Sequence, residues 1–299
     1  MRPFLLTLLV LSLAASARPT FADSIAAPGA KLELLSHDFK FTEGPATDAD
    51  GNVYFTDQPN DRIMKWSTDG KFSVFMQPCG RSNGLCFDHK GNLLACADEK
   101  NELWSISLPD KKVTVLVKDY NGKLLNGPND VWETPTGGIY FTDPYYKRDY
   151  WKRGPEEQDI EAVYYLSPDR KKLTRVIDDL TQPNGIIGTP DGRTLYVADI
   201  GANKTYSYTI HPDGSLTDKK LFCKLGSDGM TIDDEGNLYL TGHGVTVFDK
   251  TGKQIDKIET KEPWTANICL GGKDRQTLFI TASQSVYTLR TRTKGVGSQ

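Results

Sequence analysis

The sequence predicts an all-β protein, a six-bladed β-propeller with four strands in each blade. Three observations lead to this prediction. One strand–turn–strand segment recurs six times along the chain, and its copies are about one blade length apart. The 299 residues also include 27 glycines, 16 prolines and 13 tyrosines, a mix that suits many short strands joined by tight turns.

The repeated segment first occurs at residues 46–57, which read ATDADGNVYFTD. Each copy is a strand, an Asp/Gly turn and a second strand, and such a turn needs a residue with positive φ. The turn positions are Gly51, Gly91, Gly137, Gly192, Gly236 and Arg275, the last in a degenerate copy. They are 40, 46, 55, 44 and 39 residues apart, which matches propeller blades of about 40 to 50 residues.

Two further strands are expected after each hairpin, such as residues 62–66 and 72–75 in the first blade. The last copy is followed by a third strand at residues 285–289 and then only by a polar tail. Residues 31–35 form a strand-like segment before the first blade and have no blade of their own. We expect this N-terminal strand to join the last blade and close the ring, which also removes an exposed sheet edge.

The first 22 residues are typical of a secretory signal peptide. Arg2 precedes an apolar run at residues 4–15, and small residues offer cleavage sites near Ala17 or Ala22. The alternative is a membrane anchor, but the run is too short to span a bilayer. We therefore expect a signal peptide at residues 1–22, a propeller at residues 23–299, a periplasmic or secreted protein, and no membrane partner.

Charge and cysteine content exclude other classes. The net charge is −3 and the pI is about 5.9, so no nucleic-acid partner is expected. The five cysteines are odd in number and lack the spacing of a zinc site.

The repeat places six polar residues in one register, eight positions before each turn residue. They are Glu43, Asn83, Asn129, Asn184, Asp228 and Asn267. Because the first strand of a blade lines the central channel, these side chains are expected to form a ring at one mouth. An alternative is that Asn83, Asn184 and Asp228, which precede glycines, are only turn residues. That alternative does not account for Glu43 or for the shared register.

A ring with two confined carboxylates indicates a bound cation. Like charges repel and lose solvation in a narrow channel, and a cation removes both costs. Ligands that are all oxygen favour calcium or another hard cation, with magnesium, manganese or zinc as alternatives. None of the four histidines shares the register, so a zinc site built on imidazole is not favoured.

Four stretches of the chain resemble the family of gluconolactonase, senescence marker protein (regucalcin) and luciferin-regenerating enzyme. They are residues 43–45 (EGP), 126–130 (NGPND), 182–185 (QPNG) and 227–230 (SDGM). The resemblance is greatest to bacterial gluconolactonase-type members, and it implies a propeller with a channel metal and lactone hydrolysis. It also implies that Glu43, Asn184 and Asp228 bind the metal, that Asn129 contacts metal or substrate, and that Asp228 is the proton acceptor. The chain departs from the family at Gly127, where an arginine is usual.

The sequence leaves the base and the substrate contacts open. Metal coordination lowers the pKa of a carboxylate, so Glu43 is the other candidate base. Arg81 is expected to supply a donor from the neighbouring blade. The long loop at residues 144–155 is expected to cover the site, with Tyr145 against the substrate or packed on blade three. His243 is expected on the same face, as a polar loop residue or a proton-transfer group.

Three functions remain in competition. The first is a metal-dependent hydrolase that acts on a lactone such as gluconolactone. The second is an arylesterase or phosphotriesterase with the same site, because fold alone does not separate these activities. The third is a non-catalytic binding propeller, which has no need of the ring of oxygen ligands. We expect a small lactone or ester as the partner of the site.

Overall fold

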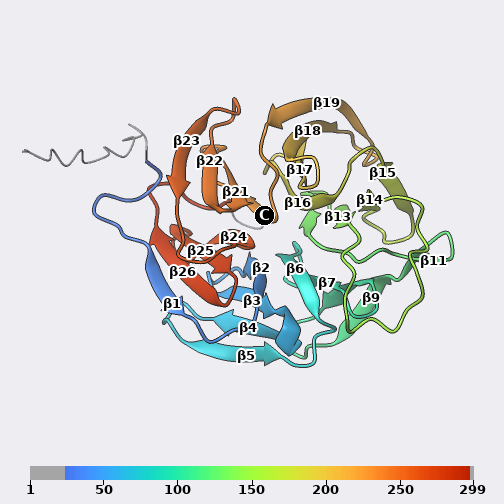
Figure 1. Cartoon of the computed structure of the whole chain (residues 1–299), viewed down its shortest axis with the longest axis horizontal. Helices are drawn as coiled ribbons and strands as arrows, with labels where there is room; N and C mark the ends of the chain where they lie inside the picture. The colour runs from blue at the N-terminus through green and yellow to red at the C-terminus, as the bar shows by residue number, and fades with distance from the viewer. Residues whose placement is uncertain (1–23, 297–299) are drawn as a thin grey trace, which may run out of the picture.

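Six four-stranded antiparallel sheets surround a central channel in the computed structural model, which describes residues 24–296 (Figure 1). The predicted propeller and its blade number are confirmed. The expected signal peptide, with its cleavage sites near Ala17 and Ala22, lies outside the described residues.

The first three blades follow the chain from the inner strand outwards. Blade one contains β2 (Thr42–Thr47), β3 (Val53–Asp57), β4 (Arg62–Trp66) and β5 (Phe72–Met76). Blade two contains β6 (Ser82–Phe87), β7 (Leu93–Ala97), β8 (Glu102–Ile106) and β9 (Val113–Val117). Blade three contains β12 (Val131–Glu133), β13 (Ile139–Asp143), β14 (Ala162–Leu166) and β15 (Leu173–Ile177).

The other three blades are built in the same way. Blade four contains β16 (Pro183–Gly188), β17 (Thr194–Asp199), β18 (Lys204–Ile210) and β19 (Leu216–Cys223). Blade five contains β20 (Met230–Ile232), β21 (Leu238–Gly242), β22 (Gly244–Phe248) and β23 (Gln254–Ile258). Blade six contains β24 (Asn267–Gly271), β25 (Thr277–Ala282), β26 (Ser285–Arg290) and β1 (Glu33–Ser36).

Blade six is completed by the N-terminal strand, as predicted. β1 pairs antiparallel with β26, with Glu33 opposite Thr288 and Leu34 opposite Tyr287. Small elements complete the structure: a short hairpin of β10 (Asp119–Tyr120) and β11 (Lys123–Leu124), and a 3-10 turn, η1 (Gln58–Asn60). Within residues 24–296 we find no helix with the length and apolar character needed to cross a membrane.

The six predicted turn positions share one backbone conformation. Their φ angles lie between 59° at Arg275 and 88° at Gly51, the left-handed region that glycine adopts without cost. Arg275 therefore occupies the same turn in blade six, although it is not a glycine. This explains why the sixth copy of the repeat is recognisable by its spacing and not by its residues.

The hydrophobic core is divided among the spaces between blades. The described residues form six buried apolar clusters, and each cluster joins two neighbouring blades. Between blades two and three, for example, Leu94 packs with Phe141 and Tyr164. All five cysteines are unpaired, and Cys86 and Cys96 lie on β6 and β7 as small strand residues.

Candidate active site

The inner strands carry the predicted ring to one mouth of the channel. Glu43 lies opposite Thr56 near the end of β3, and Asn267 lies opposite Thr281 near the end of β25. The loops that follow the second strands therefore surround this mouth, as expected from the chain direction. A cavity of about 310 Å³ opens there. It is lined by Phe41, Glu43, Asn83, Asn129, Tyr146, Arg148, Gln182, Ile200, Asp228 and Trp264.

Glycines follow four of the ring residues because the inner strands approach one another closely. A Cβ on Gly44 would lie 2.1 Å from the carbonyl oxygen of Asn83, and a Cβ on Gly84 would lie 2.5 Å from that of Asn129. Asn83 and Asn184 both lie inside strands. The Asn-Gly pairs are therefore not turns, and the alternative reading of these residues is wrong.

Glu43, which is buried, and Asp228, which is half-buried, form a pair of like charges. Loss of solvation is the largest cause that raises the pKa of each carboxyl group. The pKa of Asp228 rises to about 6, while the pKa of Glu43 rises well above its usual range, with the Asp228 charge as the second cause. Arg148 acts in the opposite direction on both groups.

Hydrogen bonds distinguish the two carboxylates. Asp228 accepts one from Trp264 Nε1 at 2.6 Å and one from Asn184 Nδ2 at 2.9 Å. Glu43 accepts one from the backbone N–H of Gly44 at 2.9 Å. Donors stabilise the charged form of a carboxylate, so Asp228 is the member of the pair that ionises first.

Two amide oxygens at this mouth lack the partners that buried polar atoms normally have. Oδ1 of Asn83 and Oδ1 of Asn184 are buried and make no hydrogen bond. Such atoms are rare because burial without a partner is costly. Together with the two carboxylates they form an all-oxygen donor set, which suits a hard divalent cation. Residues 24–296 contain no cluster of three His, Cys, Asp or Glu side chains that could hold a metal, so these residues would act as a mixed set of carboxylates and amides.

One member of the ring, Asn267, lines a different cavity from the others that line one. Asn129 lines the cavity together with Glu43 and Asp228, whereas Asn267 lines a second cavity of about 180 Å³. The Oδ1 atom of Asn267 accepts a hydrogen bond from the next backbone N–H, that of Ile268, at 2.8 Å. Asn267 therefore shares the register of the ring without facing the carboxylate pair.

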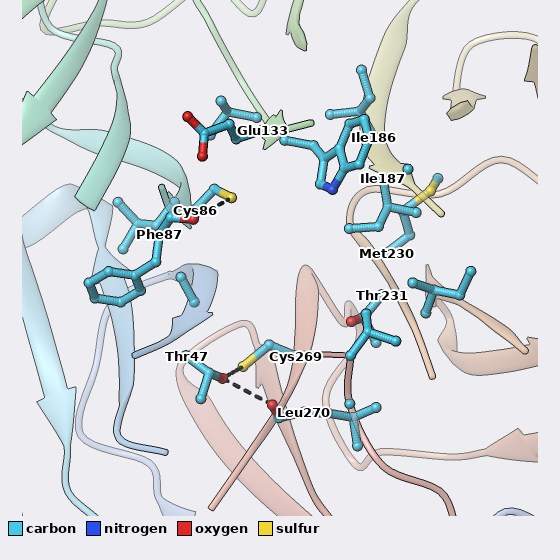
Figure 2. A pocket seen from close by; sticks show the side chains of 18 of the residues that line it. Thr47, Cys86, Phe87, Glu133, Ile186, Ile187, Met230, Thr231, Cys269 and Leu270 are labelled. Carbon is cyan, nitrogen blue, oxygen red and sulfur yellow. Dashed lines mark hydrogen bonds between the residues drawn. The ribbon is translucent and has the colours of Figure 1, made fainter. Parts of the chain in front are cut away.

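The second cavity lies towards the hairpin ends of the inner strands (Figure 2). Its labelled side chains are mostly apolar, such as Phe87, Ile187 and Met230, and the Thr47 hydroxyl donates a hydrogen bond to the carbonyl oxygen of Leu270. Glu43, Asp228 and Asn83 line the other cavity, and Asn184 is hydrogen-bonded to Asp228 there. That cavity is the better candidate for chemistry.

Three predicted substrate contacts are not among the residues that line the carboxylate cavity. Arg81 places its guanidinium 4.5 Å from the centre of the Tyr150 ring and donates to the Pro59 carbonyl. Tyr145 packs on Trp151, with ring centres 5.6 Å apart. His243 is exposed and packs edge-on against Trp264, which does line the cavity.

Six lining residues were not predicted as site residues: Phe41, Tyr146, Arg148, Gln182, Ile200 and Trp264. The long loop was expected to cover the site, but its sequence does not indicate that Tyr146 points inwards and Tyr145 does not. Tyr146 is fixed by its hydroxyl, which accepts a hydrogen bond from Asn184 Nδ2 at 2.9 Å. Gln182 lies two residues before Asn184 in one of the family-like stretches, and this was an available signal.

Comparisons with known proteins show which family this chain resembles. The model of the family described as SMP-30/Gluconolactonase/LRE-like region matches residues 41–284. A gluconolactonase of Zymomonas mobilis is 28% identical over 91% of this chain and 85% of its own length. A lactonase of Staphylococcus saprophyticus is 31% identical over 58% of this chain and 68% of its own length. The solved structure of a gluconolactonase from Xanthomonas campestris superposes with a TM-score of 0.82 at 30% identity, covering 89% of this chain and 91% of that one.

Proposed function

Because this chain belongs to the SMP-30/gluconolactonase/LRE-like family, we propose that it is a divalent-metal-dependent lactonase that opens a sugar lactone such as gluconolactone. The observation that carries the proposal is the pair of carboxylates with raised pKa values, Glu43 and Asp228, beside the unpaired amide oxygen of Asn184. Relatives named as a gluconolactonase and a lactonase support the same class of substrate.

The residues that would hold the cation are Glu43, Asn129, Asn184 and Asp228, and Asn83 offers a further oxygen. Calcium fits best, since the set contains oxygen donors only and two negative charges. When bound, the cation would supply Lewis-acid polarisation of the lactone carbonyl. The Asn184 amide is already oriented for this role, because its Nδ2 is held by Tyr146 and Asp228 and its Oδ1 is left free.

Asp228 is the proposed proton acceptor. In lactone hydrolysis a water oxygen adds to the carbonyl carbon, the ring C–O bond breaks, and a proton passes from the water to the departing ring oxygen. A carboxylate beside the water can take that proton and return it. Trp264 and Asn184 fix the Asp228 carboxylate through both of its oxygens, so its orientation is defined before substrate binds.

The walls of the cavity suit a small polar ring. Phe41, Ile200 and the Trp264 indole give apolar surfaces, while Gln182, Tyr146 and Arg148 give polar groups. Such a mixture is typical of small-molecule sites. A volume of about 310 Å³ lies at the small end of the range for ligand pockets. For the N-terminal residues we propose a cleaved signal and a periplasmic or secreted location, on the sequence pattern alone.

An activity panel tests the function. Aldonolactones, aryl esters and phosphotriesters are supplied to the purified protein with calcium, and again after metal removal by a chelator. Lactone turnover that disappears with the chelator and returns with calcium is expected. Preferential turnover of aryl esters or phosphotriesters would assign the second candidate activity to the site. If no substrate of the panel were hydrolysed by the calcium-bound protein, the result would favour the third candidate, a non-catalytic binding propeller.

A further inference from the structure

Aspartates at the end of the second strand have a common role in three blades. Each accepts hydrogen bonds from backbone N–H groups that lead into the inner strand of the same blade. Asp57 accepts from residues 40 and 41, Asp143 from residues 126 and 127, and Asp199 from residues 181 and 182. These contacts hold the chain two or three residues before the ring positions, so they are structural.

Asp98, the equivalent residue of blade two, makes different contacts. In blade two, Asp61 holds the chain before the inner strand: its Oδ1 accepts hydrogen bonds from the backbone N–H groups of Cys79 and Arg81 at 3.0 and 2.7 Å. The Asp98 carboxylate instead accepts from Arg148 Nε at 3.0 Å and from the Tyr150 hydroxyl. Its backbone oxygen accepts from Trp151 Nε1 at 2.7 Å. Asp98 therefore anchors the loop after β13 instead of its own blade.

Gly127 makes room for the anchored loop. A Cβ at this position would lie 2.8 Å from Oδ1 of Asp98 and 3.1 Å from Cζ2 of Trp151. A larger residue would therefore displace either the anchor or the Trp151 ring. The glycine and the unusual contacts of Asp98 belong to one arrangement, which places the loop over the site.

The anchored loop presents Arg148 to the cavity. Its guanidinium lies 5.3 Å from the centre of the Tyr146 ring, and Asp98 holds only its Nε edge. Within residues 24–296, neither Nη group has a hydrogen-bond acceptor, although the side chain is only 25% exposed. An Nη1/Nη2 edge has the fork geometry that binds a carboxylate through two parallel hydrogen bonds.

The surrounding charges favour an anion at this edge. A divalent cation balances the two charges of Glu43 and Asp228. Asp98 is 3% exposed, is shared among Arg148, Tyr150 and Gln58, and does not line the cavity. Arg148 is ion-paired with Asp98 through Nε, but its Nη1/Nη2 edge has no anionic partner in the described part of the chain.

We propose that Arg148, positioned by Asp98, binds a carboxylate of the substrate, and that the preferred substrates are lactones that carry a second, anionic group. This inference rests on the proposed lactonase function. Aldarolactones are the matching chemical class, because they differ from aldonolactones in having a carboxylate in place of the terminal hydroxymethyl group.

The test compares one aldonolactone with the aldarolactone of the same ring size and stereochemistry, at saturating calcium. The wild-type protein is expected to have the higher kcat/KM for the aldarolactone. Arg148→Gln should lower that kcat/KM about 10- to 100-fold, the usual effect of losing a hydrogen-bonded charge, and should change the aldonolactone value less than about threefold. The kcat/KM of Arg148→Lys for the aldarolactone should lie between those of the wild type and Arg148→Gln, because lysine keeps the charge but cannot form two parallel hydrogen bonds.

Lys147→Gln is the matched control. It removes one positive charge from the same loop, at an exposed residue that does not line the cavity, and both substrates should be unaffected. Each variant is checked by thermal melting and by its calcium affinity, which Arg148→Gln should leave unchanged or increase.

Two results would overturn the inference while leaving the lactonase intact. One is a wild-type protein that hydrolyses the neutral lactone as well as the anionic one. The other is an equal loss on both substrates in Arg148→Gln, which would place the arginine at the reacting carbonyl. Absence of turnover for every lactone, with calcium bound, would instead reject the proposed function itself.

Discussion

Asn184 donates a hydrogen bond from Nδ2 to Oδ1 of Asp228 at 2.9 Å, and its own Oδ1 is left buried without a partner. The amide is thus oriented by the carboxylate that would share a cation with it. Had the amide been reversed, two oxygens would face each other at hydrogen-bond distance. This orientation suits the proposed cation site, since it turns the free amide oxygen away from the carboxylate.

Calcium should stabilise the folded protein. Two neighbouring carboxylates of like charge and two unpaired amide oxygens cost free energy that a bound cation would recover. At a free calcium concentration one hundred times Kd, binding adds about 2.7 kcal/mol to the free energy of unfolding, or roughly 5 to 10 °C in Tm for a chain of this size. Calorimetry with calcium and with chelator measures the difference. A Tm that responds to neither would count strongly against the site.

The metal-free protein should lose stability as the pH rises. Burial raises the folded-state pKa of Asp228 to about 6, above its ordinary value of 3.8, and raises that of Glu43 further. A raised carboxyl pKa means that the fold favours the protonated form, so the stabilisation present at low pH disappears between about pH 4 and 6 for Asp228, and at higher pH for Glu43. For Asp228 the loss is at most about 3 kcal/mol.

Glu43→Gln is the control for this pH dependence. It removes the partner charge, so the metal-free variant should be more stable than the wild type at pH 8, and the gap should narrow towards pH 5. Urea unfolding of both proteins after metal removal gives the two curves. If the free energy of unfolding depended on pH in the same way in both proteins, the charge of Glu43 would have no part in this pH dependence.

Asp228 and Asn267 should differ in their effect on catalysis, although both lie in the ring register. Asp228→Asn keeps the shape and an oxygen ligand but removes the charge and the base. It should weaken calcium binding and lower kcat about a hundredfold or more at saturating calcium. Asn267→Ala should have a smaller effect on kcat, because Asn267 faces the second cavity and its Oδ1 is used by Ile268.

The outcomes of that comparison identify the group that accepts the proton from water. Full recovery of the Asp228→Asn rate by excess calcium would make Asp228 a ligand only and move the base to Glu43 or His243. A larger loss of kcat in Asn267→Ala than in Asp228→Asn would show that the active pair has been assigned to the wrong blades.

The loop after β13 should control substrate binding and not folding. Replacing residues 145–154 by a short glycine-serine linker removes Tyr146 and Arg148 from the cavity, and leaves the strands on either side intact. We expect KM to rise or substrate preference to change, with far-UV circular dichroism unchanged. Steady-state kinetics on the lactone panel measures this. Identical kinetics for all lactones would show that the loop plays no part in recognition.

Periodicity explains why the sequence predicted so much of the fold. The bounds of β4 matched the expected residues 62–66, and the N-terminal strand joined blade six. The ring register followed from the same repeat, because equivalent positions on inner strands lie at equal depth. The predicted ring also included Asn267, which faces the second cavity. Register alone does not give the direction in which a side chain points.

The side chains of the loops could not be predicted in this way. Arg81 has a positive φ of 48°, and Asp61 binds its backbone N–H, so its side chain turns towards Tyr150. Arg148 enters the cavity because of Asp98, a residue 50 positions earlier in the chain. Neither contact leaves a pattern in the local sequence. The departure of Asp98 from the role of the other three aspartates is visible only when their partners are compared.

The pairing of β1 with β26 joins nearly the two ends of the described chain, since Glu33 lies opposite Thr288. Blades one to five each form from one continuous stretch, so they can assemble while the chain is still being synthesised. Blade six cannot, because its outer strand is made first and its other strands last, and such a distant pairing is slow to form. Until that step, β26 has an unpaired edge that can recruit another chain. Truncation at either end should therefore have the same consequence, a propeller with an open seam and a tendency to aggregate.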